Sequence, residues 1–196
     1  PEVIPPEIVL PPEIVIENTA PVADAGSTRD IPRNATVILT GVGTDAEGDA
    51  LTYLWESMDG IALSDFTAVA PSFLSPAIGK TETMLLTFRL KVSDGIYESD
   101  WAMVTLTVRN FAPVVSAGMD VVAAPGELVY LSASAVDPDS DSLTMRWRSG
   151  NGLYIYNNAQ SQASVVAPSA AGTYTFDFIA SDGHLSSSDQ ITVTVQ

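Results

Sequence analysis

The sequence predicts an all-β chain in which two tandem antiparallel β-sandwiches follow an extended proline-rich segment. Two observations support this prediction. The second half of the chain repeats the first, and within each copy apolar residues alternate with polar ones in short stretches bounded by turn-forming residues. A repeat of this length sets the number of domains, and an apolar period of two is typical of half-buried strands.

The internal repeat has an offset of 92 positions over most of its length, so that Trp55 recurs as Trp147. We therefore predict one sandwich over residues 18–109 and a second over residues 110–196, each of the size of a small domain. The other matched pairs at this offset include Asn18 and Asn110, Ala20 and Ala112, Pro21 and Pro113, Leu39 and Leu131, Asp45 and Asp137, Asp49 and Asp141, and Leu51 and Leu143.

The alternation of apolar and polar residues locates the strands. Leu51, Tyr53 and Trp55 share one face of a predicted strand, and the second copy repeats the pattern up to Trp147. Because no window shows a helical stripe, we expect both tryptophans to lie at the centres of β-sandwich cores. Further strands are predicted at residues 36–41, 84–93, 102–108, 127–134, 173–181 and 190–195.

Residues 1–17 contain the unit Pro-Glu followed by apolar residues three times. Proline fixes its own φ and restricts the residue before it, so this segment is not expected to be helical. We predict an extended linker with a reach on the order of 50 Å. The alternative is an edge strand that pairs with the first sandwich, because Ile14, Val15 and Ile16 are good strand residues.

The formal charge is −16, from 24 acidic and 8 basic residues. This charge excludes nucleic acid as a partner, because the chain could not replace the counterions of a phosphate backbone. The absence of cysteine excludes disulfides and thiolate metal sites. No apolar run approaches the roughly 18 residues of a membrane span, and no leader follows Pro1, so we expect a piece of a longer protein.

Catalysis is not expected. His184 is the only histidine, and a nucleophile, a base and an orienting acid would have to be assembled around one residue in a predicted turn. No pair of carboxylates stands out as a glycoside-cleaving pair.

Two acidic loops are candidates for calcium binding. Each loop places three carboxylates at alternate positions, and calcium prefers six to eight oxygen ligands from flexible loops. The carboxylates are Asp45, Glu47 and Asp49 in the first loop and Asp137, Asp139 and Asp141 in the second. In the first copy, Glu56 stands where an EF-hand loop has its last ligand, but the equivalent residue of the second copy is Arg148. An EF-hand is therefore not expected. The alternative is that these residues form ordinary solvated turns.

Further ligands are available beside each loop. The late Ser-Asp-Gly turns supply Asp94 and Asp182, and Asn18 and Asn110 lie where the chain enters each domain. The predicted metal set is therefore Asn18, Asp45, Glu47, Asp49 and Asp94 in the first copy, and Asn110, Asp137, Asp139, Asp141 and Asp182 in the second.

Residues 18–196 resemble the PKD-like and cadherin-like bacterial immunoglobulin-type repeats. The resemblance rests on the opening Ala-Pro-Val-x-x-Ala-Gly, the acidic loop that leads into Leu-x-x-x-Trp, and the late Ser-Asp-Gly turn. It implies an immunoglobulin-like sandwich that separates or presents other domains in surface, adhesive or secreted polysaccharide-active proteins. It also implies that the entry segment, the acidic loop and the late turn share a metal.

Together these features predict a non-catalytic, calcium-stabilised spacer or adhesion module of a larger extracellular or cell-surface protein. Its partners would be the neighbouring domains, and a glycan or another surface protein. The alternative is a pair of carbohydrate-binding accessory domains of a secreted polysaccharide-active enzyme. For that alternative the candidate stacking residues are Trp101, Tyr154 and Tyr156.

Overall fold

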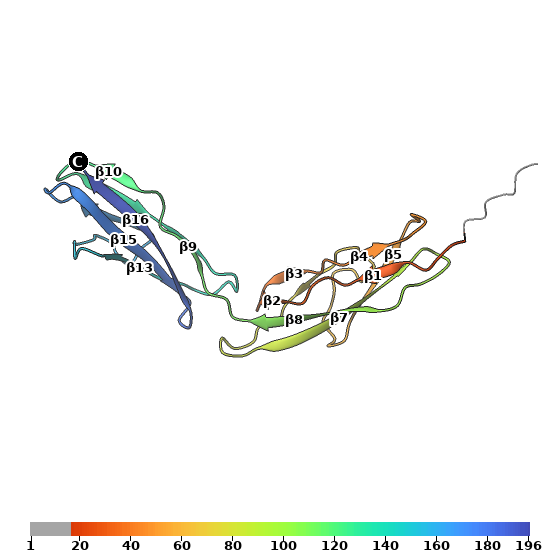
Figure 1. Ribbon diagram of the computed structural model, residues 1–196. Coiled ribbons are helices and arrows are strands. Elements are labelled where there is room, and N and C mark those ends of the chain that lie inside the picture. Colours follow the sequence, from red (N-terminus) through yellow and green to blue (C-terminus); the bar gives the residue numbers. More distant parts are fainter. Residues whose placement is uncertain (1–16) are drawn as a thin grey trace, which may run out of the picture.

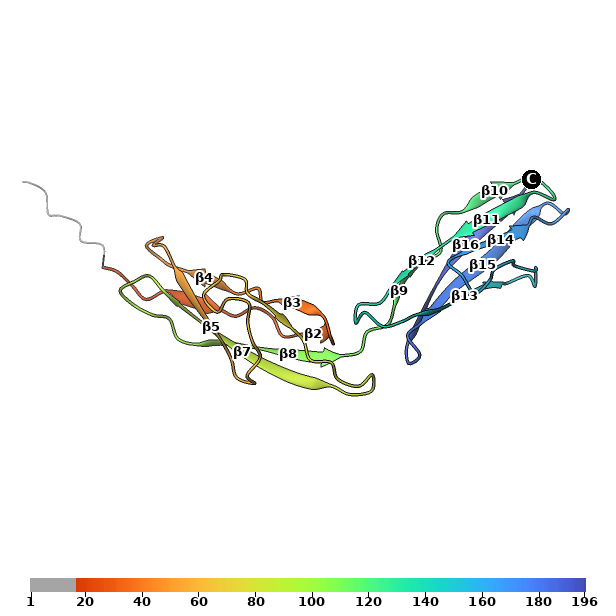
Figure 2. The same cartoon turned by 180° about the vertical axis from the view of Figure 1, so that it is seen from behind.

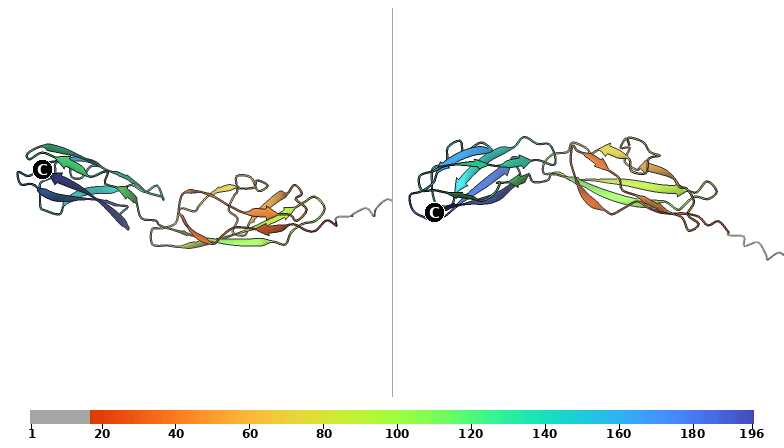
Figure 3. Two further views of the ribbon diagram at one scale, coloured as in Figure 1. Left: turned by 45° about the horizontal axis from the view of Figure 1, so that its top comes forward. Right: turned by 90° about the horizontal axis from the view of Figure 1, so that it is seen from above.

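The computed structural model describes residues 17–196, which form strands and loops. Two sandwiches lie end to end, and the C-terminus lies at the far end of the second one (Figures 1 and 3). Except for Glu17, the predicted proline-rich linker of residues 1–17 lies outside the described residues. Within the described part of the chain, no helix is long and apolar enough to cross a membrane.

The first sandwich is built around a four-stranded sheet of order β2-β8-β7-β5, with β2 parallel to β8 and the other pairs antiparallel. Two further antiparallel pairs, β1-β4 and β3-β6, complete it. The strands are β1 (Val22–Asp24), β2 (Arg29–Pro32), β3 (Thr36–Ile38), β4 (Val42–Thr44), β5 (Thr52–Ser57), β6 (Ser72–Leu74), β7 (Met84–Ser93) and β8 (Ala102–Arg109).

The second sandwich repeats this topology strand for strand. Its main sheet has the order β10-β16-β15-β13, with β10 parallel to β16, and the pairs β9-β12 and β11-β14 complete it (Figure 2). The strands are β9 (Val114–Ser116), β10 (Val121–Ala123), β11 (Leu128–Ser132), β12 (Ser134–Val136), β13 (Thr144–Ser149), β14 (Gln162–Val166), β15 (Gly172–Ser181) and β16 (Ser186–Val195).

Each sandwich encloses its own core. Trp55 and Trp147 are both 1% exposed, as predicted, and each lies at the centre of a separate cluster of buried apolar residues. Along β7, Leu86, Phe88 and Leu90 point into the core at every second position. The period of two in the sequence therefore corresponds to the inner faces of the two layers.

The repeated glycine of the opening motif has a structural reason. Gly26 and Gly118 have φ angles of 87° and 95°. A Cβ atom on Gly118 would lie 2.6 Å from the carbonyl oxygen of Ser132. Both the left-handed backbone and the close approach require glycine.

Some predicted strand bounds were wrong. The strand expected at 36–41 ends at Ile38, because the next partner, Pro71, has no N–H to donate to the ladder. The stretch expected as one strand at 127–134 divides, because β11 ends at Ser132 and β12 then pairs with β9. The strand expected at 190–195 begins earlier, at Ser186, since all ten of its residues pair with β15.

Candidate metal centre at the domain junction

The second acidic loop lies at the junction of the two sandwiches. Only residues 110–113 separate β8 from β9. The loop after β12 and the turn between β15 and β16 both point toward the end of the first sandwich (Figure 1). The carboxylates of that loop are therefore within reach of side chains from both domains.

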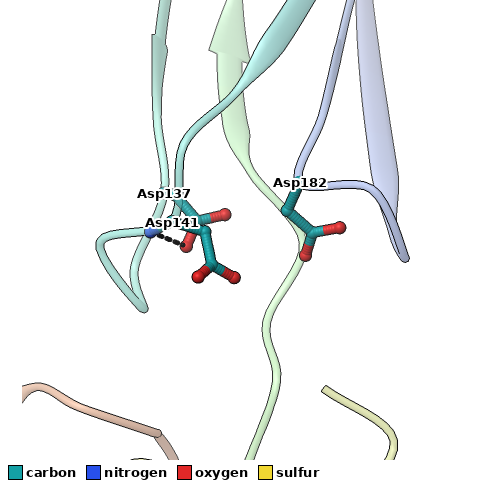
Figure 4. A group of neighbouring side chains, drawn as sticks. All are labelled: Asp137, Asp141 and Asp182. Atoms are coloured by element: carbon teal, nitrogen blue, oxygen red, sulfur yellow. Dashed lines mark hydrogen bonds between the residues drawn. The ribbon is translucent and has the colours of Figure 1, made fainter. Parts of the chain in front are cut away.

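The loop between β12 and β13 is closed by its first carboxylate. Asp137 Oδ1 accepts hydrogen bonds from the N–H groups of Asp139 (2.9 Å) and Asp141 (3.2 Å), the latter drawn in Figure 4. Ser140 adopts a left-handed conformation with φ of 63°. Asp137 is only 7% exposed, and its other oxygen, Oδ2, is buried without a hydrogen-bond partner among the described residues.

Asp137 is one of three carboxylates that converge at this loop. One oxygen each from Asp137, Asp141 and Asp182 lie within 4.8 Å of one another (Figure 4). The turn after β15 orients Asp182, because its Oδ1 accepts the N–H groups of His184 and Leu185, both at 2.6 Å. Asn110 of the linker donates its side-chain N–H to Asp182 Oδ2 at 2.7 Å. The linker, the loop and the turn thus meet at one point.

Two cations of the first sandwich also reach this point. The side chain of Arg33, 10% exposed, forms an ion pair with Asp141 and donates from Nε to Asn110 Oδ1 at 3.1 Å. Lys80 Nζ lies 3.0 Å from Asp141 Oδ2 and also donates to the carbonyl oxygen of Asp182. These contacts tie the first domain to the acidic loop of the second.

The remaining carboxylate of the second loop, Asp139, has a different role from its neighbours. Its oxygens accept the backbone N–H groups of Arg33 (2.7 Å) and Phe111 (2.6 Å), so it faces the linker instead of the convergent group. Asp139 is 1% exposed. Burial raises its pKa, although these two hydrogen bonds oppose the rise, and the charge of Asp137 adds to it.

The pKa values of Asp141 and Asp182 shift in the opposite direction to that of Asp139. Burial alone would raise the pKa of each, but hydrogen bonds outweigh it and the pKa of each is lowered. For Asp141 the donors are Arg33 and Lys80, and for Asp182 the first donor is Asn110. Both carboxylates are therefore held ionised at the junction.

The first acidic loop has the same backbone pattern in a more open setting. Asp45 Oδ1 accepts the N–H groups of Glu47 (3.1 Å) and Asp49 (3.0 Å), and Asp45 Oδ2 is again buried without a partner among residues 17–196. Asn18 donates to Asp94 Oδ2 at 2.9 Å, as Asn110 does to Asp182. Within the described residues, the corresponding carboxylates of the loop and the late turn in the first copy do not bring three oxygens within 4.8 Å of one another, as those of the second copy do.

Sequence reasoning grouped residues of the loop, the turn and the linker in each copy, but it missed Arg33 and Lys80. At the repeat offset, Pro125 stands where Arg33 would recur, and Lys80 falls in the stretch where the repeat breaks. The sequence offers one weak signal, since both are among only eight basic residues in a chain of charge −16.

The side chains proposed for sugar stacking differ in their availability. Arg89 and Lys91 lie over the ring of Trp101, 4.1 Å and 4.9 Å from its centroid. Tyr154 and Tyr156 are 74% and 49% exposed. Cation–π packing accounts for Trp101, whereas the tyrosines face solvent.

Two consecutive sandwiches, each with an acidic loop at its entry end, define a tandem immunoglobulin-like module. The chain belongs to the K319L-like PKD domain family, whose model matches residues 25–108 and 117–195. It is 27% identical over 135 residues to chitinase A of Pseudoalteromonas piscicida, a match that covers 67% of this chain. It is 29% identical over 185 residues to the dyslexia-associated protein KIAA0319 homolog of Rattus norvegicus, covering 90% of this chain.

The chain spans 16% and 17% of the lengths of these two curated relatives. The tandem pair thus corresponds to an accessory module of larger proteins. Among solved structures, a chimeric titin Z1Z2 pair is similar, with 14% identity, a TM-score of 0.42, and coverage of 92% of this chain and 99% of that one.

Proposed function

We propose that this pair of domains is a non-catalytic, calcium-stabilised spacer of a larger extracellular protein. In this proposal a calcium ion and two cationic side chains together fix the angle between the sandwiches. The observation that supports it is the buried Oδ2 of Asp137, which has no partner among the described residues and lies in a convergent group with Asp141 and Asp182. An unpaired buried carboxylate oxygen is costly unless a ligand satisfies it.

The charge balance at the junction favours a divalent ion. Four carboxylates, all from the second domain, face two cations from the first, which leaves two negative charges. Calcium prefers hard oxygen ligands and accepts backbone carbonyls and water for the rest of its coordination shell. It would satisfy Asp137 and cancel the remaining repulsion without displacing Arg33 from Asp141.

The location of the group supports a role as a spacer. Its residues come from the linker, from the loop after β12 and from the turn after β15, so an ion bound there would join all three. With a linker of only four residues between β8 and β9, the two sandwiches would keep one orientation. The partners of the module are then its neighbouring domains, which it holds at a set distance from one another.

The repeat extends the proposal to the first loop. Asp45 repeats both the hydrogen bonds of Asp137 and its unpaired buried oxygen. A second ion at Asp45, Glu47, Asp49 and Asp94, with Asn18 beside them, would act in the same way on whatever chain precedes the first sandwich. Calcium sites in extracellular modules are typically weak, at about 0.1 to 1 mM, and sites of that affinity would be filled at an extracellular location.

Calcium is expected to raise the melting temperature of the second domain in the wild-type chain but not in Asp137→Asn. At about 100 times the dissociation constant, binding to the folded state adds about 2.7 kcal/mol to the free energy of unfolding. Thermal melting in chelator and in calcium measures this, together with the stoichiometry of binding by calorimetry. Asp45→Asn, tested in parallel, assigns any second ion to the first loop.

The matched control is Asp100→Asn, which removes an exposed carboxylate that makes no side-chain hydrogen bond among the described residues. It should leave the response to calcium unchanged. If the wild-type chain melts at the same temperature with calcium and with chelator, the junction is held by Arg33 and Lys80 without an ion and the calcium proposal is wrong.

A further inference from the structure

Two of the eight cations of the chain have no partner within the described residues. Five others form ion pairs, and Arg29 donates to the carbonyl oxygen of Ile38. Within residues 17–196, Arg146 and Arg148 form no ion pair and no side-chain hydrogen bond, and both are exposed. In a chain of charge −16, two neighbouring uncommitted guanidinium groups are the unusual feature of this surface.

The strand β13 places these two groups side by side. Trp147 between them points into the core, so Arg146 and Arg148 project from the outer face of the sheet. β13 is the edge strand of this sheet among the described residues, and the loop that follows it lies along its free side, where the N–H of Trp147 donates to the carbonyl oxygen of Asn158 at 2.7 Å (Figure 2). Across the ladder lie Ile179 and Asp177, and the carboxylate of Asp177 already accepts a hydrogen bond from Gln190 at 2.7 Å.

A shallow groove of about 450 Å³ runs beside the two arginines. Its far side is formed by the segment after β13, where Tyr154 is 74% exposed. Ile155, 7% exposed, anchors this segment in the core, and Tyr154 packs edge-on against Tyr156 with ring centroids 4.9 Å apart. The groove therefore combines cationic groups with an aromatic ring held in place.

The aromatic surface continues past the groove. Tyr156 pairs through its backbone with Ser164, and Ser164 in turn pairs with Tyr130, which is 74% exposed. Residues directly opposite in neighbouring strands point to the same face, so Tyr156 and Tyr130 stand on either side of the small Ser164, roughly 10 Å apart across two strand spacings. This separation is comparable with the disaccharide repeat of an extended β-1,4-linked chain.

We propose that this surface binds an anionic polysaccharide. Carboxylate or sulfate groups pair with Arg146 and Arg148, and sugar rings stack on Tyr154, with Tyr156 and Tyr130 extending the contact. Guanidinium groups bind such planar or trigonal oxyanions with two parallel hydrogen bonds. Tyrosine offers a rigid ring face together with a polar end. The groove is too small and too polar for the apolar centre of a stable protein interface.

The first sandwich lacks this surface. At the repeat offset, Leu54 and Glu56 replace Arg146 and Arg148, and Glu56 is already paired with Arg89. Binding is therefore expected at the second domain alone. The proposal does not depend on the junction ion, since none of these residues contacts the acidic loop in the described structure.

Affinity electrophoresis of the whole chain in chelator tests the proposal. The gels contain carboxymethyl cellulose as a carboxylate polymer, cellulose sulfate as a sulfated polymer, or hydroxyethyl cellulose as a neutral one, all with the same β-1,4-linked backbone. Retardation by at least one acidic polymer and not by the neutral one is expected, and the two acidic gels distinguish carboxylate from sulfate. Arg146→Gln/Arg148→Gln and Tyr154→Ala should each weaken binding at least tenfold, with melting temperatures close to wild type.

The matched control is Arg89→Gln/Lys91→Gln, which removes the same charge from the main sheet of the first sandwich and should bind as the wild type does. Added salt should weaken the interaction because it screens exposed charges. The proposal is wrong if the wild-type chain migrates freely in both acidic gels. It is also wrong if the Arg146/Arg148 variant is retarded as strongly as the wild type, or if the chain is retarded by a gel that contains an acidic protein but not by the gels that contain acidic polysaccharide.

Discussion

Replacing Arg33 by alanine is expected to uncouple the two sandwiches. Its side chain is 10% exposed and pairs with Asp141, so its removal leaves a partly buried carboxylate with only Lys80 as partner. Breaking a buried pair by removing one member costs about 3 kcal/mol or more. We expect the free energy that couples the two domains to fall by this amount. Small-angle scattering should then show a broader distribution of interdomain distances, and NMR relaxation should show that the domains tumble more independently.

Two further variants separate charge from geometry. Arg33→Lys keeps the charge but loses the hydrogen bond from Nε to Asn110, and should be intermediate. Lys91→Ala removes the half-buried partner of the exposed Glu98, away from the junction, and should cost about 0 to 1 kcal/mol with no change in scattering. An unchanged scattering profile for Arg33→Ala would show that the junction is not held by this contact.

Arg33→Ala should also change the response of the junction to calcium. Without Arg33, the four carboxylates of the junction face Lys80 alone, so the excess rises from two to three negative charges. A divalent ion then relieves more repulsion, and its stabilising effect should be larger in Arg33→Ala than in the wild-type chain. Arg33 and the proposed ion thus both reduce the repulsion among the junction carboxylates, so both contribute to the rigidity between the domains.

The sequence predicted the long strands because their inner faces repeat every second residue. β7, β8 and β15 have this period, and the repeat made each prediction twice. Strands of only three residues, such as β1 and β10, are too short to show a period. β10 forms because the long strand β16 offers it an unpaired edge, whereas β1 pairs with β4, another strand of three residues, and neither tertiary cause has a local sequence signal.

The candidate site was predictable to the extent that its residues lie in the repeat. Asp137, Asp141 and Asp182 could be grouped because the loop and the turn recur together in both copies. The sequence could not separate Asp139 from them, because alternate spacing in a loop does not tell which carboxylate faces the linker. Arg33 and Lys80 lay beyond prediction, since their role depends on how one domain is placed against the next.

The largest effect on stability is expected from Trp147→Ala. The indole is 1% exposed, lies 5.1 Å from the ring of Phe178 between centroids, and donates from Nε1 to the carbonyl oxygen of Ser161 at 3.3 Å. Truncating a fully buried tryptophan costs about 3 to 5 kcal/mol, a large share of the 5 to 15 kcal/mol typical of a domain. Urea unfolding should show the second domain unfolding at lower urea, while the first domain keeps its transition.

Because the loop after β12 and the turn after β15 are held by this core, the variant should also weaken the junction. We expect Trp147→Ala to lose its response to calcium at concentrations of urea where the second domain is unfolded.

Trp55→Ala provides the matched case, which should shift the transition of the first domain instead. Trp101→Ala is the control, since this half-buried ring packs under Arg89 and Lys91 and its loss should cost about 1 kcal/mol. Equal shifts of both transitions in Trp147→Ala would contradict two independent cores.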